Sequence, residues 1–496
     1  MKLRDSLMMM TVLFASWIDG RDAAAQDPQP PPPPPQQQQQ MTAGEADALR
    51  NEVEELRFRQ KQLELRLDAQ RRPPPPPEPS PGREAPPPPA PLTSGPRFHF
   101  GRDGFAFGTA DGKNEIRFHA VFHFDAHAYF GDKQPAPDTF FVRRARPFVD
   151  GTLFGIVDFR LMPDLAPGQP VIADAYLELH PRPWLRIRAG RFRVPIGLEY
   201  LERDSGLALV ERSLVTDLVP FRDYGVMILG DIAGGTLEYQ AAILNGAADM
   251  ANGPDTALQS SKDYVGRLFL RPLKPWKRAA ISDLGFGIAA SYGDPHGTAA
   301  ATGLATYKST SLLSVFSYLP ATTAIPSAMA AATPAVLAAG LRWRLAPQLE
   351  WYIGPFALLA EYVLSSQRVQ HAQAFEQLTD QAWNLTARFV LTMERASSDR
   401  IQVRHPVDFQ SWNMGAWELT ARYSELRLDP NAFPTFADPN VSVRNVRELG
   451  VGLNWHLTSY TKLMFAFERS DFTGGAAMGY NRMPESALLM RMQVGL

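Results

Sequence analysis

Five arginines lie within one stretch of the chain, residues 173–224, where they could bind an anion together. They are Arg191, Arg193, Arg203, Arg212 and Arg222. The segment that carries most of them is too apolar for a solvated linker and too long for a hairpin turn, so we expect it to fold back into the protein. A guanidinium group offers five donors in a planar fork and keeps its charge at working pH. The stretch therefore predicts a binding place for a small oxyanion.

A second group of arginines, in the sequence Arg-Arg-Ala-Arg at residues 143–146, could feed an anion along a wall. Neighbours on a strand point to opposite faces, so Arg144 and Arg146 should share one face. Two observations favour a plainer interpretation. Only nine of the 50 basic residues are lysine, so arginine is common throughout the chain. The loop also carries carboxylates that could cancel its charge: Glu199, Glu202, Asp204, Glu211, Asp217 and Asp223.

Strands are the elements that would hold these arginines. Residues 173–180 and 185–191 alternate in polarity around a Pro-Arg-Pro turn. The pattern is clearest at residues 116–130, where every even position is apolar and the odd positions include Arg117, His119 and Asp125. Such a long strict alternation predicts a strand with lipid on one side and water on the other. The pattern recurs at residues 155–161, 237–243, 417–424, 448–457, 462–468 and 488–496.

Length and composition favour one large barrel. The chain has 496 residues, a net charge of −2 and no cysteine, which excludes disulfides and cysteine metal sites. Past the N-terminus no run of 18 uncharged apolar residues appears, which disfavours membrane-spanning helices but is compatible with barrel strands. With ~10 residues per crossing, the part after residue 96 can house about sixteen strands around a water-filled lumen. A soluble β-rich domain is the alternative, but its strands would be shorter.

The connections between these strands alternate in length. We expect a short turn from His456 to Thr461, and long loops from Asp294 to Ala339 and from Gln367 to Ala382. Short turns on the periplasmic side and long loops outside are typical of outer-membrane barrels. The fold class predicted is therefore an all-β outer-membrane antiparallel barrel, residues 97–496.

The N-terminal part has a different character. Residues 1–25 resemble an export signal, and residues 26–41 are a proline and glutamine tract that cannot build a core. Residues 42–71 carry apolar positions at heptad spacing and predict a short coiled coil, or else a solitary amphipathic helix. Residues 72–96 are proline-rich and predict a stiff spacer. After export, the coiled coil would lie in the periplasm and could reach the cell wall.

The sequence contains few other groups suited to catalysis or metal binding. His119, His123 and His127 recur four apart, which on a strand separates neighbours by about 13 Å, too far for one metal ion. We find no nucleophile elbow and no phosphate loop, so we predict no enzyme, no cofactor and no metal. Basic and acidic residues balance, which argues against nucleic acid as a partner.

A series of motifs resembles one family. These are FVRRARPFVDG (residues 141–151), Asp-Ala-Tyr (174–176), GRFRVPIGLE (190–199), Arg-Asp-Tyr-Gly (222–225) and WELTARY (417–423). Together they resemble the phosphate-selective porins O and P. The resemblance implies a sixteen-stranded trimeric barrel with a basic third loop folded inward, in members that conduct anions such as phosphate or polyphosphate. Asp174, in the Asp-Ala-Tyr motif, could orient an arginine or accept a proton from hydrogen phosphate.

The sequence departs from the family pattern in two ways. It ends in Leu496 where outer-membrane strands usually end in an aromatic residue, and it has no lysine between Lys133 and Lys262, where some members place lysines in the constricting loop.

Three functions remain open. The first is passive diffusion of phosphate or other small anions across the outer membrane by a lipid-embedded homotrimer. The others are a general porin whose loop charges cancel, and an envelope tether acting through the coiled coil.

Overall fold

The computed structural model describes residues 56–57, 59–62, 95–101, 104–131, 135–166, 168, 170–255, 260–276, 281–323 and 332–496. The chain divides into two compact units, Met1–Pro88 and Pro89–Leu496. In the first unit, residues 56–57 and 59–62 are helical, inside the segment 42–71 predicted to be helix. The predicted segments 1–25 and 26–41, and the spacer 72–96 except its last two residues, lie outside the described residues. Among the described residues, no helix is both long enough and apolar enough to cross a membrane.

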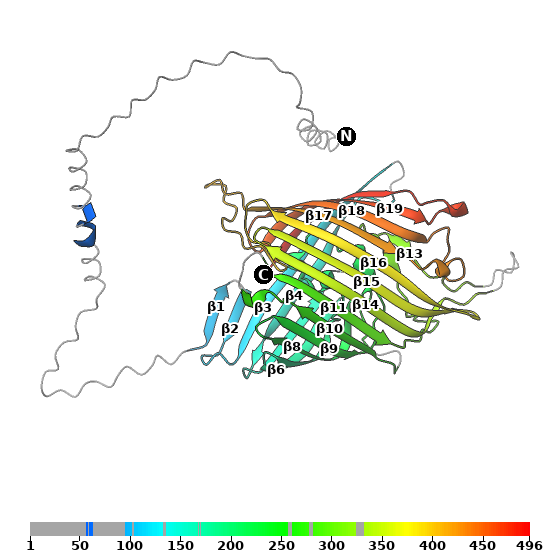
Figure 1. Cartoon of the computed structure of the whole chain (residues 1–496), viewed down its shortest axis with the longest axis horizontal. Coiled ribbons are helices and arrows are strands. Elements are labelled where there is room, and N and C mark those ends of the chain that lie inside the picture. Colours follow the sequence, from blue (N-terminus) through cyan, green and yellow to red (C-terminus); the bar gives the residue numbers. More distant parts are fainter. Residues whose placement is uncertain are drawn as a thin grey trace, which may run out of the picture. The chain divides into compact units, whose positions relative to one another are not determined.

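Sixteen strands of the second unit's described residues close into an antiparallel barrel (Figure 1). Each strand pairs with the next, and β20 pairs with β3 to close the ring. The strands are β3 (Glu115–Phe130), β4 (Thr139–Leu153), β5 (Val157–Asp164), β6 (Val171–Arg182), β7 (Leu185–Arg193), β8 (Arg222–Ile232), β9 (Leu237–Leu244), β10 (Asp263–Leu270), β11 (Leu284–Gly293), β14 (Leu337–Ile353), β15 (Phe356–His371), β16 (Ala374–Val390), β17 (Ala416–Arg427), β18 (Val443–His456), β19 (Thr461–Gly474) and β20 (Glu485–Gly495).

Smaller elements are attached to this ring. The hairpin of β1 (Arg97–Gly101) and β2 (Gly104–Gly108) extends the sheet at the start of β3, and β12 (Tyr307–Lys308) pairs with β13 (Ser314–Phe316) inside a loop. One short α-helix and several 3₁₀ turns lie in the connections: α3 (Leu198–Leu201), η1 (Asp204–Gly206), η2 (Leu214–Leu218), η3 (Lys274–Trp276), η5 (Pro430–Ala432) and η6 (Ala477–Gly479).

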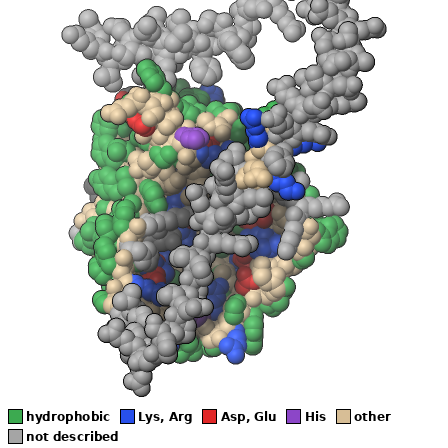
Figure 2. All heavy atoms as spheres, turned by 90° about the vertical axis from the view of Figure 1, so that its left-hand side faces the viewer, with side chains coloured by type: hydrophobic (Ala, Val, Ile, Leu, Met, Phe, Trp, Pro, Cys, Tyr) green, Lys and Arg blue, Asp and Glu red, His purple; other side chains and the backbone are tan. Residues whose placement is uncertain are grey.

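The predicted alternation is confirmed along β3. Phe118, Phe122 and Phe124 are exposed on the outer face, whereas His123 and Asp125 on the opposite face are fully buried inside the barrel. In Figure 2, hydrophobic side chains gather along the sides of the face shown, and charged side chains lie toward its middle. The barrel thus presents an apolar outside and a charged inside, as strands between lipid and water require.

The predicted pattern of connections is partly confirmed. The short turn from His456 to Thr461 and the long connection from Asp294 to Ala339 are present. The loop predicted from Gln367 to Ala382 is wrong, because β15 and β16 run through it and only residues 372–373 separate them. The segment is rich in polar residues, but all except residues 372–373 belong to β15 and β16. Conversely, residues 391–415 form a long connection at the end of the barrel where β3 begins and β20 ends, which we call the short-turn end.

The loop of residues 194–221, between β7 and β8, provides much of the buried core. Its side chains Val194, Ile196, Val215, Leu218 and Val219 are at most 1% exposed. They pack with residues of β8, β14, β15 and β16, so the loop lies inside the barrel against one side of the wall. Burying each such side chain contributes about 1.5–3 kcal/mol, which is why an apolar loop stays in a charged lumen. The inward fold of this loop, the third at the long-loop end, agrees with the sequence prediction.

Candidate functional site

Polar contacts fix the loop against the wall at several points. The backbone N–H groups of Leu198 and Glu199 donate to the carboxylate of Glu361 on β15, at 2.6 and 3.2 Å. Lys462 on β19 donates to the carbonyl oxygen of Leu207 at 2.8 Å. Gly206 approaches the connection 391–415 so closely that a Cβ there would lie 2.2 Å from the carbonyl oxygen of Ser398. The loop is therefore a fixed part of the lumen and positions its charged side chains.

Four arginines surround the carboxylate of Asp204 in η1. Arg212 Nη2 lies 2.9 Å from Oδ1, and Arg193 Nη2 and Arg144 Nε lie 3.3 and 3.7 Å from Oδ2. Arg146 also donates from Nη1 to Oδ2. Arg144 and Arg146 come from β4, Arg193 ends β7 and Arg212 belongs to the loop, so the cluster joins the wall to the loop.

The cluster is supported by neighbouring groups. Arg146 Nε donates to Asp164 Oδ2 at 2.6 Å. Arg193 and Arg212 both donate to the carbonyl oxygen of Glu202, at 2.6 and 3.2 Å. Their guanidinium carbons lie 5.3 and 5.4 Å from the centre of the Tyr200 ring, within the range of a cation–π contact. These contacts fix the orientation of the guanidinium groups before any anion arrives.

The electrostatic consequence is visible at Asp204. Burial alone would raise the pKa of its carboxyl, but the four guanidinium groups hold that pKa well below its ordinary value. The carboxylate therefore remains charged, and it neutralises only one of the four positive charges around it. The cluster as a whole stays positive.

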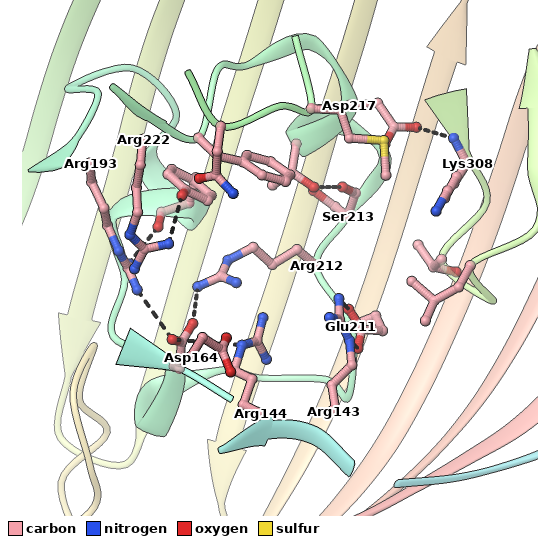
Figure 3. A pocket seen from close by; sticks show the side chains of 18 of the residues that line it. Arg143, Arg144, Asp164, Arg193, Glu211, Arg212, Ser213, Asp217, Arg222 and Lys308 are labelled. Atoms are coloured by element: carbon pink, nitrogen blue, oxygen red, sulfur yellow. Dashed lines mark hydrogen bonds and ion pairs between the residues drawn. The ribbon is translucent and has the colours of Figure 1, made fainter. Parts of the chain in front are cut away.

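Two cavities meet at this cluster. One, toward the long-loop end, has a volume of about 240 Å³, and the other, toward the short-turn end, about 590 Å³. Arg146, Arg193 and Asp204 line both, so the cluster separates them. Figure 3 shows Arg144, Arg193 and Arg212 reaching toward the first cavity from different elements, with Lys308 on its far side.

Basic side chains outnumber acidic ones in both linings. Of the described residues, seven basic and four acidic ones line the first cavity, and seven basic and three acidic ones line the second. In a lumen shielded from bulk water, such an excess attracts anions and can replace part of their hydration shell.

The other predicted site residues lie around this cluster, except one. Arg222 donates from Nε to Asp174 Oδ1 at 2.7 Å, so Asp174 does orient one of the predicted arginines. Arg203 lines the second cavity and pairs with Asp399 at 3.2 Å. Arg191 is 4% exposed, lines neither of the two cavities and pairs with Asp255 of another loop at 2.6 Å.

Sequence reasoning misjudged the direction of one member of the site and missed the roles of two others. Arg143 should point away from Arg144, but a β-bulge between β3 and β4 turns it inward, where it makes two hydrogen bonds to Glu211 at 2.8 and 3.1 Å. Lys308, from the hairpin of β12 and β13, lines the first cavity. The only signal for Lys308 was its place in a long predicted loop. Asp204 was recognised only as a charge that could cancel arginines, not as the centre of their cluster.

The opposite side of the interior, β14 to β19, has a different charge pattern. Arg422 contacts Glu448, Glu468 and Glu199 at 2.9, 3.1 and 3.5 Å, and its side chain is 1% exposed. Arg388 contacts Glu418 at 2.7 Å. Here the loop covers the wall, and carboxylates match or outnumber the arginines. We call this the closed side, and the side of β3 to β8 with its two cavities the open side.

The chain matches one protein family and is similar to several solved structures. The family described as phosphate-selective porin O and P matches residues 115–495. Among solved structures, the anion-selective porin from Comamonas acidovorans is 9% identical, with a TM-score of 0.46 and coverage of 77% of this chain and 100% of its own. The outer membrane channel DcaP of Acinetobacter baumannii is 10% identical, with a TM-score of 0.46 and coverage of 77% and 97%.

A third solved structure, the trimer form of OmpT of Vibrio cholerae, is 10% identical, with a TM-score of 0.44 and coverage of 77% of this chain and 99% of its own. No curated protein matches the chain. The family match covers nearly the whole barrel, from the first strand of the ring to the last, and the chain therefore belongs to the family of phosphate-selective porins O and P.

Proposed function

We propose that this chain is an outer-membrane channel for passive, anion-preferring diffusion, and that phosphate or polyphosphate is the anion it favours. One observation carries the proposal: four guanidinium groups share a single carboxylate where the two cavities meet. A tetrahedral oxyanion at this point can accept hydrogen bonds from several guanidinium groups in succession as it moves from one arginine to the next. Family and fold point to a channel in the outer membrane rather than to an enzyme.

The loop's carboxylates support this choice over a general porin. Burial raises the pKa of Glu202 to about 8 and raises that of Asp217 well above its ordinary value. Glu202 is therefore largely protonated at neutral pH and does not cancel arginine charge, and burial favours the neutral form of Asp217. Asp204 and Glu211 remain ionised, because arginines lower their pKa values despite burial. Cancellation of the loop's arginines is thus incomplete.

Single-channel conductance in planar bilayers tests the proposal, with chloride as carrier and phosphate titrated in. We expect low phosphate concentrations to block the chloride current, and Arg212→Gln to weaken the block by about tenfold, the effect of one lost charge-assisted bond. Arg203→Gln is the matched control, because Arg203 belongs to the same loop but its side chain is 66% exposed. Current that stays ohmic and insensitive to phosphate in the wild type would identify a general porin.

Assembly and tethering extend this proposal. We propose a homotrimer embedded in outer-membrane lipid, as the family resemblance implies, which cross-linking in native membranes would test.

The envelope-tether function rests on residues 42–71 and remains a prediction. Deleting residues 26–96 should then weaken the envelope while the conductance of the barrel stays unchanged.

A further inference from the structure

The outer face of the barrel carries a group of arginines that the channel function does not use. Arg427, Arg447 and Arg469 lie on the adjacent strands β17, β18 and β19. Each shares the face of its strand with an apolar or aromatic residue that is exposed on the outside: Tyr423 on β17, Leu449 on β18 and Phe467 on β19. Their side chains are 53%, 58% and 50% exposed. We call these three residues the outer arginine cluster.

The strand register brings the cluster together. Arg447 lies opposite Glu425 on β17 and opposite Asp471 on β19. Glu425 accepts bonds from Arg427 at 2.9 and 3.1 Å and from Arg447 at 3.2 Å, and Asp471 accepts one from Arg469 at 3.2 Å. These carboxylates fix the arginine side chains on the wall, while half of each remains open to the surroundings.

The level of the cluster along the barrel is defined by its neighbours. Along β17 the outward residues run from Trp417 through Leu419 and Tyr423 to Arg427, which ends the strand at the long-loop end. Trp383 stacks obliquely on Tyr423, with ring centres 5.2 Å apart, and donates to Glu425 at 3.3 Å. Tryptophan and tyrosine mark the border between hydrocarbon and headgroups. The arginines therefore lie just beyond the hydrocarbon, at headgroup level.

This end of the barrel faces the outer leaflet. Both described barrel termini, the start of β3 and the end of β20, lie at the short-turn end, which is periplasmic in outer-membrane barrels. At the long-loop ends of β3, β10 and β11, the outward residues are Phe130, Tyr264 and Tyr292. The wall thus changes from aromatic on that side to basic on β17 to β19.

We infer that the outer arginine cluster binds the phosphate groups of a phosphorylated glycolipid of the outer leaflet. Arginine forks match phosphate oxygens, and basic residues at headgroup level bind anionic lipids. The acyl chains of such a lipid would lie on the apolar band of Tyr423, Leu449 and Phe467 directly beneath its phosphates. The inference requires only the barrel and its location, so it stands or falls independently of phosphate passage through the lumen.

Native mass spectrometry of the full-length protein in detergent tests this inference, with purified bis-phosphorylated lipid A as probe. We expect the triple variant R427Q/R447Q/R469Q to bind the probe at least tenfold more weakly than the wild type. The matched control R182Q/R395Q/R404Q removes three exposed arginines at the short-turn end and should bind within twofold of the wild type. If both triple variants lost lipid A binding equally, or if neither lost any, the inference would be overturned.

Two further binding experiments identify the ligand. Dephosphorylated lipid A, with the same acyl chains, should bind the wild type as weakly as the phosphorylated form binds the triple variant. Inorganic phosphate at the concentration of the probe should not displace it; displacement would assign the cluster to free phosphate rather than to lipid. If the triple variant does not fold, R447Q alone should weaken binding about threefold, because Arg447 lies between the other two, and R447K should restore only part of the loss.

Discussion

The open and closed sides of the barrel interior use the same residue types in different proportions. On the closed side, Arg422 is surrounded by the carboxylates of Glu448, Glu468 and Glu199, and the loop excludes water from all of them. On the open side the ratio is inverted, since four arginines share Asp204 and border two cavities.

If the lumen conducts anions as proposed, the difference gives arginine two separable roles. An arginine whose charge is fully compensated fixes a loop to the wall, whereas an arginine in excess leaves positive charge for a passing ion. The number of arginines in a segment cannot distinguish these roles. The ratio of guanidinium to carboxylate groups within contact distance can, and mutations on the two sides should separate effects on folding from effects on conduction.

Replacing Arg422 by Met should produce the largest change. It leaves Glu448, Glu468 and Glu199 buried without their shared cation, and removing one partner of a buried ion pair costs about 3–5 kcal/mol. We expect the midpoint of urea unfolding to fall strongly and the loop to become sensitive to protease. Arg427→Met is the control, because Arg427 lies on the same strand with half of its side chain exposed and should change stability by less than about 1 kcal/mol. Similar midpoints for the two variants would show that the closed side is not held by its ion pairs.

Replacing Asp204 by Asn should have the next largest effect: it removes a buried carboxylate that four arginines share, which lowers stability, and it should also change conduction. It removes the carboxylate that all four arginines share and raises the local positive charge by one. We expect the ratio of chloride to potassium permeability, taken from reversal potentials, to rise on the order of tenfold, after allowance for screening. Bound phosphate should also dissociate more slowly, because the Asp204 carboxylate no longer competes with it for the four guanidinium groups. An unchanged ratio would mean that ions do not pass this cluster.

Much of this architecture could be predicted from the sequence because barrel strands have a simple period. Alternation at residues 116–130 indicated a lipid-facing strand, and the structure confirms it. The inward loop could also be predicted, since its apolar residues had no other place to be buried. The motif at 174–176 placed Asp174 beside an arginine of the site, although it did not specify that the partner is Arg222.

The sequence could not reveal features that depend on register and on contacts between distant segments. One extra residue at the β3–β4 bulge turns Arg143 inward, and a bulge of this kind leaves no clear mark in the polarity pattern. Arg191 lies opposite Ala175 and Tyr224 and donates to Asp255 of a distant loop, a contact that no local pattern contains. The match between Arg422 and three carboxylates joins four separate segments, so no local pattern contains it.

The pH dependence of selectivity should show a smaller effect and separate Glu202 from Asp204. Burial is the main cause that raises the pKa of Glu202 to about 8, so this carboxyl is neutral below that pH and negative above it. Anion preference should therefore be constant from mildly acidic to neutral pH and should fall about twofold as the pH rises through 8. Glu202→Gln should abolish the fall. Asp204, whose pKa is lowered, should cause no change across the same range. A fall that persists in Glu202→Gln would assign the titration to another group.

Arg203→Gln should have the smallest effect and gives the sharpest test of the comparison, because Arg203 lies in the same loop as Arg212. The side chain of Arg203 is 66% exposed and pairs with the partly exposed Asp399, whereas that of Arg212 is 9% exposed and contacts Asp204. An exposed ion pair contributes about 0–1 kcal/mol, and solvent screens its field. Stability should hence be unchanged and conductance should fall by less than about twofold. If Arg203→Gln weakened phosphate block as much as Arg212→Gln, the total charge of the loop rather than the excess around Asp204 would determine selectivity, and the distinction between compensated and excess arginines would fail.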